Sequence, residues 1–369
     1  MSTARDERFM KMAIGLARRG LGATSPNPVV GAVVVRGDEV IGRGWHARAG
    51  EPHAEAIALH RAGDRARGAE LFVTLEPCCH HGRTPPCTDA ILASGVRRVV
   101  AAMRDPFDAV GGKGIALLKR RGVRVDVGCL AAECGEVNAA YLKRVTTKYP
   151  LVTLKAALSL DGRIAAPSGE SQWLTGAAAR AIVQELRAQV DAIAVGVGTI
   201  LADDPRLTVR VTRRRRRPVR VVFDAKLRTP PDARLFKDSG GPVVIVARGD
   251  APAARSARLR DAGAGILRVP GARDGEGISL RPALRALAHE GVNHLLVEGG
   301  GRVATSLLAA RLVDRLVLFY APILLGGERL LVGNLGIPRL EQAPRLTSSS
   351  WRRIGTDVCF TGNLKSRAD

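Results

Sequence analysis

The chain has 369 residues and a formal net charge of +22, with 46% hydrophobic but only 4% aromatic residues. This length suits two hydrophobic cores better than one. No run approaches the roughly 18 to 20 apolar residues that a membrane-spanning helix needs, and no N-terminal segment has the pattern of a secretory signal. We therefore expect a cytoplasmic protein without a membrane partner.

The cysteines and the basic residues each suggest a chemistry. Six cysteines are too few for a disulfide scaffold, and the clustering of Cys78, Cys79 and Cys87 points to metal binding or catalysis in a reducing compartment. The run Arg213–Arg217 lacks interleaved aromatic residues and a nucleic-acid-binding motif, so we interpret it as a solvated loop and expect no nucleic-acid partner. A basic field also suits small anionic substrates such as phosphate esters.

The first part of the chain alternates short apolar runs with helical patterns, which is typical of an α/β layer architecture. We expect helices over residues 6–19, 53–62, 88–94, 115–121 and 133–144, a β-hairpin formed by residues 29–35 and 39–44, and strands over residues 70–75, 97–103 and 123–127.

Tyr149-Pro150 breaks this pattern, and the boundary predicts two domains, residues 1–148 and 149–369. The second domain has its own α/β order, and no internal repeat relates the two halves. Its predicted strands are residues 151–158, 192–197, 219–223, 243–247, 294–298 and 313–320, and its predicted helices are residues 177–189, 281–290 and 302–310.

A candidate zinc site is carried by His53, Cys78 and Cys87. The first lies at a predicted helix start and the cysteines lie near strand or helix ends, where the helix dipole favours a thiolate. Three protein ligands leave a fourth zinc position for water, whose pKa the metal lowers to about 7. Glu55 stands two residues after His53, so it can move protons without binding the metal. This pattern predicts a catalytic zinc deaminase with one zinc ion per chain.

Other residues of the same types compete for these roles. Cys79 directly follows Cys78 and is expected to point elsewhere, whereas His80 and His81 would contact substrate or hold the loop. The two proposed cysteine ligands are separated by eight residues, 79–86, where the common deaminase signature has two.

The residues around these cysteines resemble the zinc loop of the bifunctional riboflavin-biosynthesis deaminase/reductase family. In that family a long spacer between the cysteines is itself diagnostic. The similarity covers nearly the whole chain through residues 25–31, 44–46, 49–55 and 74–87 in the first half and residues 155–163, 168–173, 201–210 and 297–301 in the second. One departure is Phe107, because the family often has Asn after the residues equivalent to Asp105-Pro106.

The resemblance implies a cytidine-deaminase-like α/β/α domain followed by a dihydrofolate-reductase-like α/β domain. The first would deaminate 2,5-diamino-6-ribosylamino-4(3H)-pyrimidinone 5′-phosphate, and the second would reduce the ribosyl group of 5-amino-6-(5-phosphoribosylamino)uracil to ribityl with NADPH. The cofactor residues implied are Ala157, Trp173, Thr199, Asp203, Gly300, Gly301, Arg302, Val303, Ala304, Thr305 and Ser306. The substrate residues implied are Asn27, His46, His80, Arg83, Lys155, Ser171, Arg187, Leu207, Arg210 and Glu298.

The residues of the second half support this interpretation in part. Glycines after the predicted strand 294–298 allow the backbone to approach a phosphate, and a following helix supplies N–H donors. The spacing is not the G-x-G-x-x-G of a standard dinucleotide fold. The arginines at positions 187 and 210 would suit the substrate 5′-phosphate, and Lys155 would orient the ribose.

Two other hypotheses stay open from the sequence. A nucleic-acid deaminase would use the basic surface but leaves the reductase-like half unexplained. A binding or regulatory protein with a structural zinc leaves Glu55 and the open metal position unexplained. The sequence does not determine the oligomeric state, and a homo-oligomer is compatible with it.

Overall fold

The computed structural model describes residues 2–82, 84–211, 217–272, 275 and 277–365. Contacts within the chain divide it into two compact units, Met1–Thr147 and Lys148–Asp369. The division falls one residue before the boundary placed by the sequence. Among the described residues, none of the helices combines the length and apolar character needed to cross a membrane.

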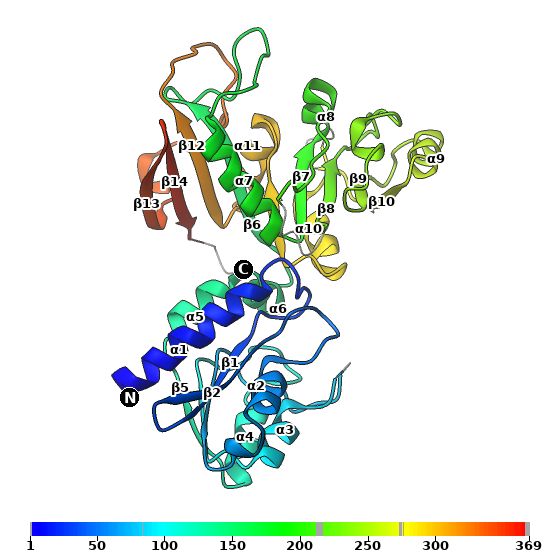
Figure 1. Ribbon diagram of the computed structural model, residues 1–369. Helices are drawn as coiled ribbons and strands as arrows, with labels where there is room; N and C mark the ends of the chain where they lie inside the picture. The colour runs from blue at the N-terminus through cyan, green and yellow to red at the C-terminus, as the bar shows by residue number, and fades with distance from the viewer. Residues whose placement is uncertain (1, 83, 212–216, 273–274, 276, 366–369) are drawn as a thin grey trace. The chain divides into compact units, whose positions relative to one another are not determined.

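The first unit is built on a mixed five-stranded sheet with the order β2-β1-β3-β4-β5. Figure 1 labels β1, β2 and β5 of this sheet. β1 pairs antiparallel with β2 and β3, and β3, β4 and β5 run parallel. The strands are β1 (Gly31–Arg36), β2 (Glu39–Trp45), β3 (Glu70–Val73), β4 (Arg98–Ala101) and β5 (Arg124–Val127). The helices are α1 (Ala4–Ala17), α2 (Ala54–Ala62), α3 (Cys87–Ser94), α4 (Lys113–Arg120), α5 (Ala131–Val137) and α6 (Ala139–Thr147), with 3-10 turns at Arg18–Gly20 and Gly63–Ala66.

Both faces of this sheet are covered, because successive strand residues point to opposite sides. Val33 and Val35 pack in a buried cluster with α1 and α5, whereas Ala32 and Val34 pack with α2, α3 and α4. α2 lies directly against β2, and a Cβ added at Gly44 would stand 2.2 Å from the Ala54 carbonyl oxygen. This close packing fixes the N-terminal end of α2, where His53 and Glu55 lie.

The single helix predicted over residues 133–144 is wrong, because the structure has two helices there, α5 and α6. Asn138 lies between them and is buried. Its amide accepts a hydrogen bond from Val29 N at 2.9 Å and donates one to Val29 O at 3.0 Å. This tertiary contact stabilises the break, and local helical spacing gives no sign of it.

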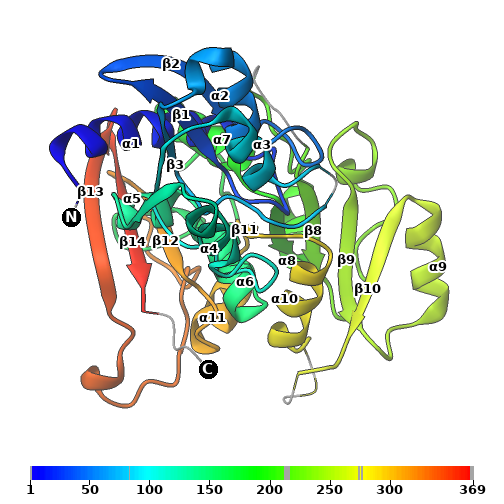
Figure 2. The ribbon, with the colours of Figure 1, turned by 90° about the horizontal axis from the view of Figure 1, so that it is seen from below.

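The second unit is built on a nine-stranded sheet with the order β10-β9-β8-β7-β11-β6-β12-β14-β13. Neighbouring strands are parallel from β10 to β12, and β14 and β13 are antiparallel to their neighbours. Figure 2 shows β10 with α9 at one end of this sheet and β13 at the other.

The strands of this unit are β6 (Leu151–Ser159), β7 (Ala192–Gly196), β8 (Val219–Phe223), β9 (Val243–Arg248), β10 (Ala264–Val269), β11 (His294–Val297), β12 (Arg315–Ala321), β13 (Leu346–Ile354) and β14 (Asp357–Leu364). The helices are α7 (Ala177–Gln189), α8 (Val197–Asp203), α9 (Ala253–Asp261), α10 (Leu280–His289) and α11 (Gly301–Ala309), with 3-10 turns at Arg234–Phe236 and Leu340–Gln342. α10 and α11 pack on one face, and α7, α8 and α9 pack on the other.

Five elements of this unit were not predicted from the sequence: α8, α9, β10, β13 and β14. The apolar signal of two of them is weak. β13 is exposed along almost its whole length, so it has no buried alternating face. α9 buries only Ser256 and Leu259.

The parallel order of the strands brings the carboxyl ends of β6, β7 and β11 to one edge of the sheet, which is the usual position of a ligand site in such sheets.

Candidate functional sites

The three predicted metal ligands converge in the first unit. His53 is the N-cap of α2, Cys87 is the first residue of α3, and Cys78 lies between β3 and α3. The donor atoms of these side chains all lie within 4.8 Å of one another. His53 Nδ1 is 3.2 Å from Cys87 Sγ and 3.4 Å from Cys78 Sγ. Helix starts and a loop thus bring together residues that are up to 34 positions apart in the chain.

These donors fit a zinc ion. With Zn–S near 2.3 Å and Zn–N near 2.0 Å, donors on one tetrahedral zinc lie roughly 3.5 to 3.8 Å apart. Hydrogen bonding, first from Cys87 and then from His53, lowers the pKa of Cys78 to about 4, which favours the thiolate that a metal requires. The other ring nitrogen of the histidine lies 3.4 Å from Thr84 Oγ1, a contact that orients the ring.

Glu55 lies in the first turn of α2 and is buried beside this cluster. Burial raises the pKa of its carboxyl to about 7, although the charge of His53 acts in the opposite direction. A carboxyl that titrates near neutrality can both accept and return a proton at working pH. The Glu55 side chain is therefore suited to proton transfer at a metal-activated water.

Asn27 and His46, both predicted to bind substrate, meet beside the metal ligands. Asn27 Nδ2 is 3.1 Å from His46 Nε2, and His46 Nδ1 is 3.2 Å from the Pro52 carbonyl oxygen. The His46 ring stands edge-on to the His53 ring with centroids 5.1 Å apart. Burial lowers the pKa of His46, so the neutral imidazole is favoured.

Two buried carboxylates near this site were missed by sequence reasoning. Glu76, which precedes Pro77-Cys78, accepts hydrogen bonds from the backbone N–H groups of Asp105, Gly112 and Ile115 at 3.2, 3.0 and 3.1 Å. Asp105 in turn accepts from Tyr141 Oη at 2.9 Å. An acidic residue directly before Pro77-Cys78 is visible in the sequence and could have drawn attention to Glu76. Only the fold shows that Glu76 joins the cysteine loop to the start of α4.

The long spacer between the cysteines places His80 beside Phe107. Their ring centroids are 6.3 Å apart, and the Phe107 side chain is 43% exposed. His80 Nδ1 is buried and has no hydrogen-bond partner among the described residues. Cys79 does not contribute to the cluster of metal donors found in the described part of the chain. Arg83, predicted to bind substrate, lies outside the described residues, as do positions 213–216 of the arginine run.

A buried cluster of charges lies in the second unit. Arg187 on α7 donates from Nε to Glu298 Oε1 at 2.7 Å and from Nη2 to Glu298 Oε2 at 2.8 Å. Lys155 on β6 pairs with the same carboxylate, with its Nζ 3.8 Å from Glu298 Oε2. Burial would raise the pKa of Glu298, but the two cations lower it to about 2. The carboxylate therefore stays ionised at neutral pH.

The predicted cofactor residues gather mainly at the carboxyl edge of this sheet. Gly300 N donates to Thr199 Oγ1 at 3.3 Å, which links the start of α11 to α8. Val303 packs so close to β7 that a Cβ added at Gly196 would lie 2.6 Å from its Cγ2. Ser171 Oγ donates to Asp203 Oδ1 at 3.3 Å. Ala157 lies on the same half-buried side of β6 as Lys155.

The remaining predicted residues have more varied surroundings. Leu207 and Ala304 lie in the hydrophobic core. Trp173 is 66% exposed, with the Arg180 guanidinium 4.7 Å from its ring centroid.

Thr305 Oγ1 accepts from Gly333 N at 2.8 Å, and Ser306 Oγ donates to Arg302 O within α11. A Cβ at Gly301 would meet Leu330 O at 2.2 Å. Arg210 is exposed, and its backbone N–H donates to Gln184 at 2.8 Å.

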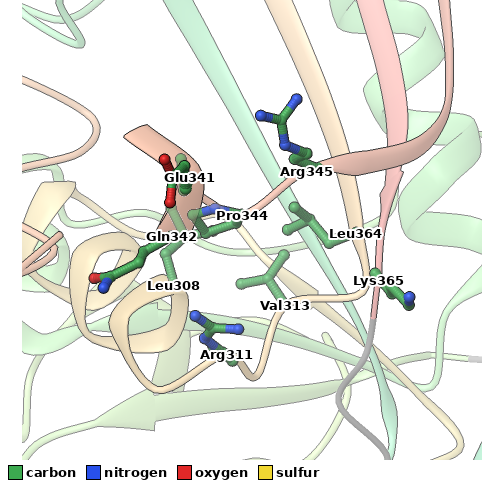
Figure 3. A pocket seen from close by; sticks show the side chains of 10 residues that line it. Leu308, Arg311, Val313, Glu341, Gln342, Pro344, Arg345, Leu364 and Lys365 are labelled. Carbon is green, nitrogen blue, oxygen red and sulfur yellow. The ribbon is translucent and has the colours of Figure 1, made fainter. Parts of the chain in front are cut away.

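A separate cavity of about 490 Å³ in the second unit is lined by none of the predicted site residues. Figure 3 shows its apolar side chains, among them Leu308, Val313 and Leu364, with the cationic Arg311 and Arg345 around them. It lies between the end of α11, the segment that leads into β13 and the end of β14.

Comparisons with known proteins give a match for each of the two units. Residues 3–103 match the cytidine and deoxycytidylate deaminase zinc-binding region, and residues 150–360 match the RibD C-terminal domain. The riboflavin biosynthesis protein RibD of Escherichia coli (strain K12) is 42% identical over 368 residues, which cover 96% of this chain and 98% of that protein. The RibD protein of Aquifex aeolicus (strain VF5) is 40% identical over 353 residues, with 96% and 97% covered.

Solved structures agree as well. RibD of Acinetobacter baumannii, form 1, has a TM-score of 0.88 at 36% identity, covering 98% of this chain and 99% of that one. A deaminase/reductase of Thermotoga maritima has a TM-score of 0.83 at 33% identity, again covering 98% and 99%. These matches confirm the predicted fold class, a cytidine-deaminase-like domain followed by a reductase domain of the dihydrofolate-reductase type. The chain belongs to the RibD family and is a bifunctional deaminase and reductase of riboflavin biosynthesis.

Proposed function

We propose that the first unit deaminates 2,5-diamino-6-ribosylamino-4(3H)-pyrimidinone 5′-phosphate and that the second reduces 5-amino-6-(5-phosphoribosylamino)uracil with NADPH. The Thermotoga maritima relative is named for these two activities, a diaminohydroxyphosphoribosylaminopyrimidine deaminase and a 5-amino-6-(5-phosphoribosylamino)uracil reductase. The observation that carries the proposal is the buried Glu55 carboxyl beside three converging metal donors.

In the deaminase site, His53, Cys78 and Cys87 would hold one zinc ion. When bound, the ion would polarise a water molecule and make it nucleophilic at neutral pH. Glu55 would accept one proton from the attacking water and pass it to the ring nitrogen, and would then carry the remaining hydroxyl proton to the departing amino group. One water is consumed, the bond between the ring carbon and its exocyclic amino group breaks, and ammonia leaves as a ring carbonyl forms.

The residues around the zinc site would hold the pyrimidine ribotide. His46 stands beside His53 and contacts Asn27, and we add His80 and Arg83 of the loop between the cysteines to this set. The Asn27–His46 contact fixes both side chains before substrate arrives, which lowers the entropy lost on binding.

In the reductase site, the start of α11 and its neighbours would bind NADPH. Backbone N–H groups at a helix start suit a phosphate, and α11 begins at Gly301. The cofactor residues proposed are Ala157, Trp173, Thr199, Asp203, Gly300, Gly301, Arg302, Val303, Ala304, Thr305 and Ser306.

The ribosyl group would lie over the buried charges of this unit and take up a hydride and a proton. NADPH supplies the hydride, and the protein supplies orientation and charge. The substrate residues proposed are Lys155, Ser171, Arg187, Leu207, Arg210 and Glu298.

We also propose that the protein works in the cytoplasm. The cysteines form no disulfide with one another, as expected in a reducing compartment.

The decisive test is Glu55→Gln, with the exposed Glu133→Gln as the matched control. The purified variants are given the diaminopyrimidine ribotide, and ammonia is measured. Deamination should fall by about 10²- to 10⁴-fold in Glu55→Gln, because the proton carrier is lost. Zinc content, and NADPH oxidation with the deaminated ribotide, should match those of the parent. Parental ammonia release by Glu55→Gln would reject the proposed role.

A further inference from the structure

Two loops of the second unit are joined along the edge of its sheet. The β6 loop, residues 160–171, follows β6, and the β12 loop, residues 322–333, follows β12. β6 and β12 are parallel neighbours, so both loops start from the carboxyl edge. Ile164 N donates to the Arg329 carbonyl oxygen at 2.9 Å, so backbone pairing continues beyond the strands. The two loops therefore form one joined segment beside the carboxyl ends of the strands.

Asp161 of the β6 loop is the side chain that fastens the two loops. Its carboxylate accepts hydrogen bonds from the backbone N–H groups of Leu325 and Gly326 in the β12 loop, at 3.1 and 2.8 Å. Ser159 Oγ, at the end of β6, donates to the same carboxylate at 2.6 Å. The bond from Ser159, followed by the one from Gly326, lowers the pKa of Asp161 to about 2. The carboxylate is therefore ionised at neutral pH, which strengthens its bonds to backbone donors.

Both loops also reach residues of the proposed NADPH site. The β12 loop passes so close to the start of α11 that a Cβ added at Gly301 would stand 2.2 Å from the Leu330 carbonyl oxygen. The β6 loop ends at Ser171, whose Oγ donates to Asp203 Oδ1 at 3.3 Å. Gly301 and Asp203 are both among the cofactor residues proposed above. Separation of the loops would therefore displace groups on two sides of that site.

We propose that Asp161 is a positioning residue for NADPH binding, because it keeps the β6 and β12 loops joined in the arrangement that receives the cofactor. The inference rests on the proposed NADPH site and adds a residue that acts through the two loops. Without the carboxylate, the joined arrangement is populated only in part, and the apparent Kd for NADPH rises as that fraction falls. Bound NADPH restores the arrangement, so kcat at saturating cofactor changes little.

The test measures the Kd for NADPH of Asp161→Asn by titration calorimetry of the full-length protein. The values of kcat and KM for NADPH are measured with the deaminated ribotide. Both Kd and KM should rise about tenfold, as expected if the joined fraction falls to about one tenth, while kcat stays within about twofold of the parent. Asp261→Asn changes an exposed acid at the end of α9 and should match the parent.

A second variant disturbs the same junction by different chemistry. A Cβ added at Gly327 of the β12 loop would stand 2.9 Å from Pro167 Cγ in the β6 loop, at a φ of +74°. Gly327→Ala should therefore also raise the Kd for NADPH and leave kcat nearly unchanged. Gly336→Ala is the matched control, since its φ is +66° but an added Cβ has no heavy atom within 4 Å among the described residues. The double variant Asp161→Asn with Gly327→Ala should weaken binding by less than the product of the single effects, because both act on one junction.

Several results would overturn the inference. It fails if Asp161→Asn binds NADPH as tightly as the parent. It fails if kcat falls while Kd is unchanged, which is the pattern of a preparation that contains less folded enzyme. It also fails if Gly327→Ala and Gly336→Ala weaken NADPH binding equally, or if the double variant shows the full product. If the parent itself does not bind NADPH, the proposed cofactor is wrong, which is a distinct outcome.

Discussion

Two neighbouring thiols, Cys78 and Cys79, have opposite surroundings. Hydrogen bonds from Cys87 and His53 lower the pKa of Cys78, whereas burial, together with the charge of Glu76, raises the pKa of Cys79. Of these two thiols, only Cys78 belongs to the cluster of metal donors in the described part of the chain. Cys78→Ser should lose most of the zinc, and Cys79→Ser should keep one zinc ion per chain. Elemental analysis of the two purified variants measures this, and equal zinc loss in both would contradict the assignment.

The pKa of Glu298 predicts how the stability of the reductase unit depends on pH. The folded-state pKa of about 2 lies below the ordinary value of 4.5, so the ionised carboxylate stabilises the fold above about pH 5. The lowering of the Glu298 pKa corresponds to about 3 kcal/mol of unfolding free energy. This stabilisation is lost as the pH falls from 4.5 toward 2.

Urea unfolding of the parent and Glu298→Gln at several pH values between about 3 and 7 tests this. The difference in unfolding free energy should be largest at neutral pH, because Arg187 and Lys155 then lose their buried partner. It should shrink on acidification, whereas Glu185→Gln, which changes an exposed residue of α7, should show no such trend. A difference that stays constant with pH would count against the assignment.

At the scale of elements, Glu76 joins two segments that shape the deaminase site. Its carboxylate accepts from the N–H groups of Gly112 and Ile115 at the start of α4 and from Asp105 N. Backbone donors at a helix start need such partners, and a negative charge there also matches the helix dipole.

Glu76→Gln should destabilise the deaminase unit by about 1 to 3 kcal/mol, because an amide replaces a buried charged acceptor of three donors. Glu133→Gln is the matched control, since this residue is an exposed acid in the first turn of α5. Thermal unfolding and ammonia release would be measured for both variants. An unfolding temperature of Glu76→Gln equal to that of the control would show that the three bonds contribute little.

At the scale of the whole molecule, each unit has its own hydrophobic core. The clusters beneath α1 and α2 belong to the first unit, and those beneath α7 and α10 belong to the second. A ligand that binds one unit should therefore stabilise that unit by mass action and leave the other nearly unchanged.

Removal of zinc by a chelator should lower the unfolding temperature of the first unit only. Each kcal/mol of lost stabilisation shifts the transition by about 2 to 4 °C in a domain of this size. Calorimetry would resolve the two transitions, and added NADPH should raise the one assigned to the reductase unit. A chelator that lowered both transitions equally would argue against separate units.

The sequence by itself determined the chemistry of the first site, because residue type and order are enough to identify a His-x-Glu followed by two cysteines. It also determined the fold class, because strands and helices with a regular apolar pattern bury their apolar face in the core and can therefore be recognised in the sequence. It missed β13 and α9, whose exposed residues carry little periodic signal. The family match confirmed the fold class and the two activities.

Only the tertiary structure decided how distant side chains pair. Arg187 and Glu298 are 111 positions apart, so no local pattern shows that one neutralises the other. Asn138 separates α5 from α6 and is hydrogen-bonded to Val29, which is 109 positions away in the chain. Glu76 accepts a hydrogen bond from the backbone N–H of Gly112, which lies 36 positions later at the start of α4. Local residue patterns show which side chains have the chemistry to react. Hydrogen bonds and packing between segments far apart in the chain decide which of these side chains are fixed in position and in which charge state.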